Sequence, residues 1–215
     1  ILKIIYLTSE SYIDHSYTIV KEINKHCSFK VYIQAKQLTD EIKKWCSILS
    51  AEFRKRKRFR DPSSFFTEAM FLLKIRKLKV DLIWFNTMTL YQVILARLIL
   101  KNFIVVLHDI EDHPESGEKH GTFSSRLTKK MAGKRICTAS KTQAEIYKRQ
   151  TGRYPLVFQL PVIDYFKENG FKAEKNETVK LRFFFFGSIE KYKGLETLLE
   201  AAEILNSKAL EYELN

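Results

Sequence analysis

The sequence predicts a doubly wound α/β domain, in which helices cover both faces of a parallel β-sheet. Short runs rich in β-branched and aromatic residues recur along the chain, and most are apolar at successive positions, not at alternate ones. Strands of this kind are buried on both faces, which is typical of parallel sheets. Segments with apolar residues at helical spacing separate the runs, as βαβ units require. We therefore expect a Rossmann-like domain over residues 1–165.

Each expected strand is an apolar run that a turn signal or a helical pattern follows. In chain order, the expected strands are residues 2–7, 29–35, 81–85, 102–109, 135–139, 157–162 and 181–186. The run at 102–109 ends in polar residues, which places His108 at the carboxyl end of a strand.

The expected helices carry apolar residues three and four positions apart and begin next to residues that cap helix N-termini. In chain order, they lie near residues 14–26, 38–53, 63–73, 89–100, 123–132, 140–151 and 194–205. Thr39 or Asp40 can cap the second helix, which we expect to continue through Phe53 into the basic segment after it. Gly152 stands where a C′ glycine would end the sixth helix.

The composition changes over residues 166–180, where Lys, Glu and Asn replace apolar residues. This change indicates a linker between domains. A strand and a helix follow it, so a second α/β domain is expected over residues 181–215. Because the chain reaches Asn215 inside this pattern, we expect the second domain to be truncated after its first strand and helix.

The net charge of +12 predicts an anionic partner, because a positive surface concentrates phosphates, acidic lipids and nucleic acid around it. The basic septet is the densest cluster. It comprises Arg54, Lys55, Arg56, Lys57, Arg58, Phe59 and Arg60. The septet is either a solvated loop or a site for nucleic acid, an anionic membrane or a lipid diphosphate. A membrane is the preferred partner, since each basic residue near an acidic bilayer contributes ~1 kcal/mol.

No apolar run approaches the roughly 18–20 residues that cross a bilayer, and the first residues lack the pattern of a signal peptide. We expect a cytoplasmic protein that is either free or peripheral at the inner face of the membrane. Cys27, Cys46 and Cys137 are scattered, which favours reduced thiols.

A loop from Gly187 to Gly194 joins the strand at 181–186 to the helix after it. In such sheets ligands bind at the carboxyl ends of strands, and a helix start there offers backbone N–H groups to a phosphate. Lys193 adds a full positive charge. The loop is not a Walker motif, because Lys193 precedes the second glycine. From the residues alone, phosphate binding and an ordinary turn both remain open.

Residues 185–201, FFGSIEKYKGLETLLEA, resemble the C-terminal domain of family 4 (group 1) GT-B glycosyltransferases, which shows F-x-G-R-x4-K-G-x3-L-x2-A. Further upstream, VVLHD with the later HP, ICTASK and QLPVIDYF resemble other segments of that family, in the same order. The resemblance spans essentially all 215 residues. It departs from the family at Ser188, where the family has arginine, and the E-x7-E motif of the family would lie beyond Asn215.

The resemblance implies two Rossmann-like domains, with the acceptor bound mainly by the first and a nucleotide-diphosphate sugar mainly by the second. It implies a hexosyltransferase of polysaccharide biosynthesis that acts with retention on a glycan or lipid-linked acceptor, without a metal or a cofactor. Gly187, Ser188, Lys193 and Gly194 would hold the donor diphosphate. This piece of the enzyme is expected to be inactive alone.

His108 matches the histidine that contacts the donor sugar in that family, so it is the candidate catalytic residue. The alternative is a strand-end histidine that bonds a nearby carbonyl. Ser9, Glu10 and His15 follow the first strand and are candidate acceptor contacts. The His-x4-His-x6-His spacing that begins at His108 matches no standard metal site.

A function of a different class is a non-catalytic α/β module that holds nucleic acid or an anionic membrane on its basic surface. A nicotinamide dehydrogenase is disfavoured, because the chain contains no G-x-G-x-x-G.

Overall fold

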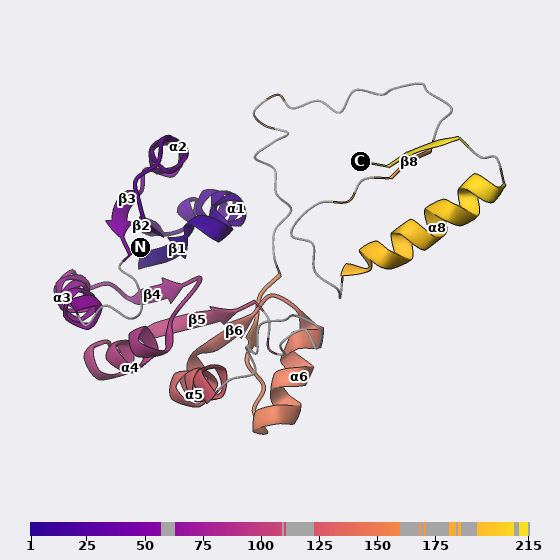
Figure 1. Ribbon diagram of the computed structural model, residues 1–215. Coiled ribbons are helices and arrows are strands. Elements are labelled where there is room, and N and C mark those ends of the chain that lie inside the picture. The colour runs from indigo at the N-terminus through magenta and orange to yellow at the C-terminus, as the bar shows by residue number, and fades with distance from the viewer. Residues whose placement is uncertain are drawn as a thin grey trace. The chain divides into compact units, whose positions relative to one another are not determined.

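The computed structural model describes residues 1–56, 63–108, 110, 123–159, 168, 170, 181–183, 185, 193–208 and 211–214. These residues form two compact units (Figure 1). The first unit holds the described residues up to Gly170, and the second holds those from Leu181 onward.

The first unit is built on a seven-stranded sheet. Its strands are β1 (Lys3–Ser9), β2 (Ser28–Ala35), β3 (Glu52–Lys55), β4 (Leu82–Phe85), β5 (Phe103–Leu107), β6 (Ile136–Thr138) and β7 (Leu156–Val157). The strand order is β3-β2-β1-β4-β5-β6-β7, and every neighbouring pair is parallel. This is the strand order of a doubly wound Rossmann-like sheet, so the predicted fold class is confirmed.

Helices cover both faces of this sheet (Figure 1). They are α1 (Ile13–Asn24), α2 (Asp40–Ile48), α3 (Ser63–Lys77), α4 (Leu90–Ile99), α5 (Phe123–Ala132) and α6 (Lys141–Thr151), with short 3-10 helices η1 (Glu10–Tyr12) and η2 (Gly133–Arg135). Side chains of β1 alternate between the two faces. Tyr6 packs with α1 and α2, whereas Ile5 and Leu7 pack with α3, α4 and α5.

Three of the predicted helix boundaries are confirmed by their capping contacts. The backbone N–H of Ile42 donates to Oγ1 of Thr39 over 3.2 Å, which fixes the start of α2. Oε1 of Gln92 accepts from the backbone N–H of Thr89 over 2.8 Å at the start of α4. Gly152 ends α6 with φ of +70°, a left-handed conformation that a side chain would strain.

The prediction that the second helix continues through Phe53 is wrong. The helix ends at Ile48, Ser50 takes φ of +49°, and Glu52–Lys55 forms the edge strand β3. Phe53 pairs with Ile33 of β2 and packs against the α1 and α2 face. Apolar residues four positions apart share one face in a strand as well as in a helix, so the spacing alone does not separate the two.

The second unit contains β8 (Leu181–Phe183), α8 (Leu195–Ser207) and β9 (Tyr212–Leu214). β8 and β9 pair in parallel, so α8 is the crossover of a βαβ unit. The expected strand and helix are therefore present, and β9 is a strand that the sequence analysis did not anticipate.

One residue of the predicted linker at 166–180 is held by α1. The carboxylate of Glu168 accepts a hydrogen bond from the hydroxyl of Tyr17 over 2.8 Å and forms an ion pair with Lys21. The hydrogen bond from Lys21 lowers the pKa of the Glu168 carboxyl most, and the hydrogen bond from Tyr17 lowers it further. The chain is therefore anchored to the first unit at this point.

The three cysteines are free thiols. Cys137 lies within β6, and burial raises the pKa of its thiol to about 11.

Adjacent leucines on α3 test the orientation of this helix. Leu72 is 0% exposed and Leu73 is 40% exposed. Leu72→Ala should lower the free energy of unfolding by about 2–5 kcal/mol, because it leaves a cavity in the core. Leu73→Ala should change it by less than about 0.5 kcal/mol. Urea unfolding of both variants measures this difference, and equal losses would contradict the placement of α3.

Candidate functional site

The candidate site lies at the carboxyl ends of β1, β4 and β5. The chain leaves β1 towards β2 and leaves β4 towards β5, in opposite directions along the sheet. In open α/β sheets, ligands bind outside the carboxyl ends of the strands at such a switch point. Ser9 ends β1, Asn86 follows β4 and His108 follows β5. The backbone N–H of Asn86 donates to the carbonyl of Leu7 over 2.8 Å, which holds these two strand ends together.

A buried network of hydroxyl groups connects β1 to α1 beneath these strand ends. Oγ of Ser16 lies 3.1 Å from the Tyr6 hydroxyl, 2.8 Å from Oγ1 of Thr8 and 2.6 Å from the carbonyl of Tyr12. Burial raises the pKa of Tyr6, so its phenol keeps its proton and is available as a donor. The network fixes the start of α1 relative to the end of β1.

Asn86 brings an unsatisfied acceptor to the switch point. Its side chain is 1% exposed, and Nδ2 donates to Oγ1 of Thr8 over 3.3 Å. Oδ1 of Asn86 has no hydrogen-bond partner within the described part of the chain. A buried acceptor without a partner costs about 1–3 kcal/mol, so its presence calls for an explanation such as a ligand donor. Asn86 was not among the predicted site residues, although it directly follows a predicted strand.

The imidazole of His108 is held on two sides. Nε2 lies 3.0 Å from the backbone carbonyl of Asn86, and the ring stacks on Tyr12 with centroids 4.0 Å apart and planes 13° apart. Because a carbonyl oxygen only accepts, Nε2 carries the proton and Nδ1 is the acceptor nitrogen of the neutral ring. The carbonyl contact is the alternative that the sequence left open, and together with Tyr12 it also orients the ring.

The three expected acceptor contacts differ in exposure. Ser9 is 6% exposed, whereas Glu10 in η1 is open to solvent. Nδ1 of His15 is buried and has no hydrogen-bond partner among the residues described. Tyr12, which lies between them in the sequence, makes the contact to His108 that the sequence analysis missed.

Of the residues expected to bind the donor diphosphate, Lys193 and Gly194 are described in the second unit, whereas Gly187 and Ser188 lie outside the described residues. Gly194 precedes α8 with φ of +71°, a conformation that costs an L-residue roughly 1–2 kcal/mol. Its carbonyl accepts the N–H of Leu198 over 3.0 Å. The first backbone N–H groups of a helix have no intrahelical acceptor, and the exposed Lys193 stands next to them. Glu196 in the first turn opposes this positive charge.

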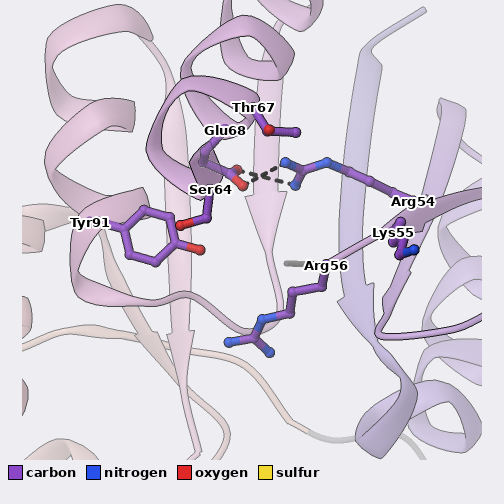
Figure 2. A pocket seen from close by; sticks show the side chains of 7 residues that line it. All are labelled: Arg54, Lys55, Arg56, Ser64, Thr67, Glu68 and Tyr91. Carbon is purple, nitrogen blue, oxygen red and sulfur yellow. Dashed lines mark hydrogen bonds and ion pairs between the residues drawn. The ribbon is translucent and has the colours of Figure 1, made fainter. Parts of the chain in front are cut away.

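Arg54 of the basic septet points into the protein. Its guanidinium makes two hydrogen bonds to the carboxylate of Glu68, of 3.1 Å and 2.5 Å (Figure 2). The guanidinium also lies 3.8 Å from the centre of the Phe71 ring. The two charged side chains are only 12% and 5% exposed. Arg54 is therefore a structural residue and not part of the expected anionic-partner patch.

Lys55 and Arg56 are the exposed members of the septet in the described chain, and Lys57, Arg58 and Arg60 lie outside it. A small pocket opens beside Arg54. Its lining consists of Arg54, Lys55, Arg56, Ser64, Thr67, Glu68 and Tyr91 (Figure 2). Of the helices described, none is both long and apolar enough to cross a bilayer.

Within the described ranges, no three His, Cys, Asp or Glu side chains gather as metal ligands would. In the His-x4-His-x6-His segment, which matches no standard metal site, His108 is described and the other two histidines lie outside these ranges.

No known family profile and no curated protein matches the sequence. Solved structures do match it. UDP-GlcNAc 2-epimerase from Neisseria meningitidis bound to UDP-GlcNAc is 12% identical with a TM-score of 0.66, and the match covers 99% of this chain and 65% of that one. A glycosyltransferase from Rickettsia africae is 16% identical with a TM-score of 0.62, over 99% of this chain and 59% of that one.

Alr3699/HepE from Anabaena, in complex with UDP and glucose, is 14% identical with a TM-score of 0.59, over 94% of this chain and 57% of that one. This chain thus spans about three fifths of the length of the structures it matches. At these identities the likeness shows the fold alone, a Rossmann-like α/β fold of the GT-B type.

The tautomer of His108 is testable by NMR. In ¹⁵N-labelled protein with neutral imidazole rings, Nε2 of His108 should carry the proton and Nδ1 should show the chemical shift of an unprotonated nitrogen. His26 is exposed and serves as the reference. Tyr12→Leu should weaken this preference, because one of the two groups that hold the ring is lost. A protonated Nδ1 in the unmodified protein would contradict the observed geometry.

The pair of Arg54 and Glu68 should respond to mutation as a buried ion pair. Glu68→Gln should lower the free energy of unfolding by about 3–5 kcal/mol, since it leaves the guanidinium without a countercharge. Glu22→Gln removes an exposed pair with Lys25 and should leave the free energy of unfolding nearly unchanged, because water screens that pair. Guanidinium chloride unfolding compares the two, and the double variant Arg54→Met/Glu68→Leu should recover most of the loss.

Proposed function

We propose that this chain belongs to a GT-B sugar transferase, which moves a hexosyl group from a nucleotide-diphosphate sugar to a glycan or lipid-linked acceptor with retention and without a metal. The observation that carries the proposal is the convergence of Ser9, Asn86 and His108 at the switch point of a sheet of this fold. The likeness to structures that contain UDP, glucose or UDP-GlcNAc supports a sugar-nucleotide substrate. In this proposal, residues 1–165 would act as the acceptor-side domain and residues 181–215 would belong to the donor-binding domain.

The orientation of His108 suits a hydrogen-bonding role towards the sugar. Because Nε2 lies against the carbonyl of Asn86, a hydrogen bond from a sugar hydroxyl to His108 would use Nδ1 as its acceptor. Tyr12 holds the ring plane, so the imidazole loses little freedom when substrate binds. The unpaired Oδ1 of Asn86 would accept a second hydroxyl.

Breaking the bond between the sugar and the diphosphate leaves negative charge on the departing phosphate. Without a metal, that charge requires a cation and N–H donors that are already in place. Lys193 and the first turn of α8 would supply them. Gly194 would allow close approach of the phosphate, because it carries no side chain.

A second candidate is a nucleotide-sugar epimerase, since several of the matching structures are UDP-N-acetylglucosamine 2-epimerases. The two reactions differ in one requirement. An epimerase changes the sugar without an acceptor, whereas a transferase releases nucleoside diphosphate only when an acceptor is present or water replaces it.

The proposal is tested by thermal shift with nucleoside diphosphates and their sugars, on a polypeptide in which this sequence is joined to a complete second domain. A ligand at 100 times its dissociation constant should stabilise the protein by about 2.7 kcal/mol. The reaction with and without acceptor is then followed by nucleotide release. Stabilisation by no nucleotide would contradict both enzyme candidates and favour the non-catalytic module.

Two variants separate the proposed roles in that enzyme. Lys193→Ala should reduce turnover roughly 10²- to 10³-fold, as loss of one preorganised donor to developing charge does. Lys208→Ala, at the other end of α8, is the matched control and should leave turnover unchanged. His108→Ala should lower turnover while nucleotide binding persists. If the effects of Lys193→Ala and Lys208→Ala are equal, the role of Lys193 is refuted.

A further inference from the structure

The outer face of α3 carries large apolar side chains that no part of the described chain covers. Phe66 is 71% exposed, Met70 66% and Leu73 40%, and they lie at positions i, i+4 and i+7 along one stripe of the helix. Phe65 beside them is 46% exposed. Contiguous exposed apolar side chains on a soluble domain mark interaction sites. We call these four residues the α3 outer face.

The exposure follows from the way α3 packs. Its opposite stripe consists of Ser64, Glu68, Leu72 and Ile75, all of which are buried. Leu72 and Ile75 belong to the hydrophobic core, and Glu68 is paired with Arg54. The helix therefore has two apolar faces, and the core occupies only one of them.

Positive charge surrounds the α3 outer face. The exposed basic residues in and just after the helix are Lys74, Arg76, Lys77 and Lys79. Glu68 is the acidic residue of α3, and its charge is buried against Arg54. The exposed Lys55 and Arg56 precede the helix in the sequence. Among the described residues of α3, the solvent side thus carries cations and apolar groups without an exposed carboxylate.

We propose that the α3 outer face lies in the interface of an anionic lipid bilayer. Phe66, Met70 and Leu73 would enter the boundary between headgroups and acyl chains, where interfacial apolar groups are buried by roughly 5–10 Å. Lys74 and Lys77 would extend their long side chains to lipid phosphates from the same surface. The stripe from Phe66 to Leu73 is about 10 Å long, so it can lie parallel to the membrane plane.

Charge complementarity favours a bilayer over a second copy of this chain. A two-fold dimer would place the α3 outer face of one copy against the same face of the other. That arrangement would bring Lys74 and Lys77 near their own counterparts without an exposed carboxylate of α3 to compensate them. Lipid phosphates supply the negative charge that the face itself lacks.

The inference differs from binding by the basic septet alone. Attraction between lysines and headgroups is screened by salt, whereas insertion of aromatic and aliphatic groups is not. Membrane binding through α3 should therefore persist in part at high salt. It also requires no sugar-transfer activity, so its failure would not affect the proposed function.

The test is flotation of the 215-residue chain with vesicles of phosphatidylcholine alone and of phosphatidylcholine with phosphatidylglycerol. The chain should float with the anionic vesicles. Phe66→Ser/Met70→Ser should lower the partition coefficient at least tenfold in 0.5 M salt. Lys74→Gln/Lys77→Gln should lower it roughly tenfold or more at low salt, because each cation contributes about fivefold.

Matched controls come from exposed residues elsewhere on the first unit. Leu98 on α4 is 75% exposed, and Leu98→Ser should leave the partition coefficient unchanged. Lys141→Gln/Arg149→Gln on α6 removes two exposed charges and should have a smaller effect than the pair on α3. Circular dichroism melting confirms that each variant is folded.

Three outcomes would overturn the proposal. In the first, the chain does not float with anionic vesicles at all. In the second, Phe66→Ser/Met70→Ser floats as well as the unmodified chain. In the third outcome, sedimentation shows an oligomer that this variant dissociates while vesicle binding stays the same, which would assign the face to contacts between copies.

Discussion

The parallel pairing of β1 with β4 is the constraint on which the candidate site depends. Strands that run in the same direction end at the same edge of the sheet, so residues far apart in the sequence meet there. The bond from the N–H of Asn86 to the carbonyl of Leu7 sets the offset of the two strand ends. The carbonyl of Asn86 contacts Nε2 of His108, which follows the next strand of the sheet. The ring of Tyr12 in η1 stacks on the imidazole of His108. A shift of β4 by one residue would turn Asn86 to the other face of the sheet.

Much of the fold could be predicted from the sequence, because a strand buried on both faces carries its own signature of continuous apolar residues. β3 shows where that signature fails. It lies at the edge of the sheet, it is short, and all of its residues except Phe53 are charged. Such a segment gains its stability from pairing with β2. Because this pairing is non-local, residues 52–55 alone do not indicate it.

Only those site residues that directly follow an apolar run could be predicted from the sequence. Ser9 and His108 follow apolar runs and were recognised, whereas the partners of His108 depend on which strands are neighbours. Asn86 and His108 are separated by 22 residues and meet because β4 and β5 are adjacent. The burial of Arg54 was hidden for a similar reason, since its carboxylate partner lies 14 residues away, beyond a run of positive charge.

The ion pair between Arg54 and Glu68 has a consequence for the helix that carries it. Glu68 lies midway along the inward side of α3. Two hydrogen bonds join its carboxylate to Arg54 of β3, which is paired in the sheet. If α3 rotated about its long axis so that its exposed aromatic side chains became buried, these two hydrogen bonds would break. An unpaired charge would then remain in the interior. The ion pair therefore keeps the apolar stripe of α3 exposed to solvent. Substitutions on that stripe can accumulate without disturbing the packing of the inward side of the helix.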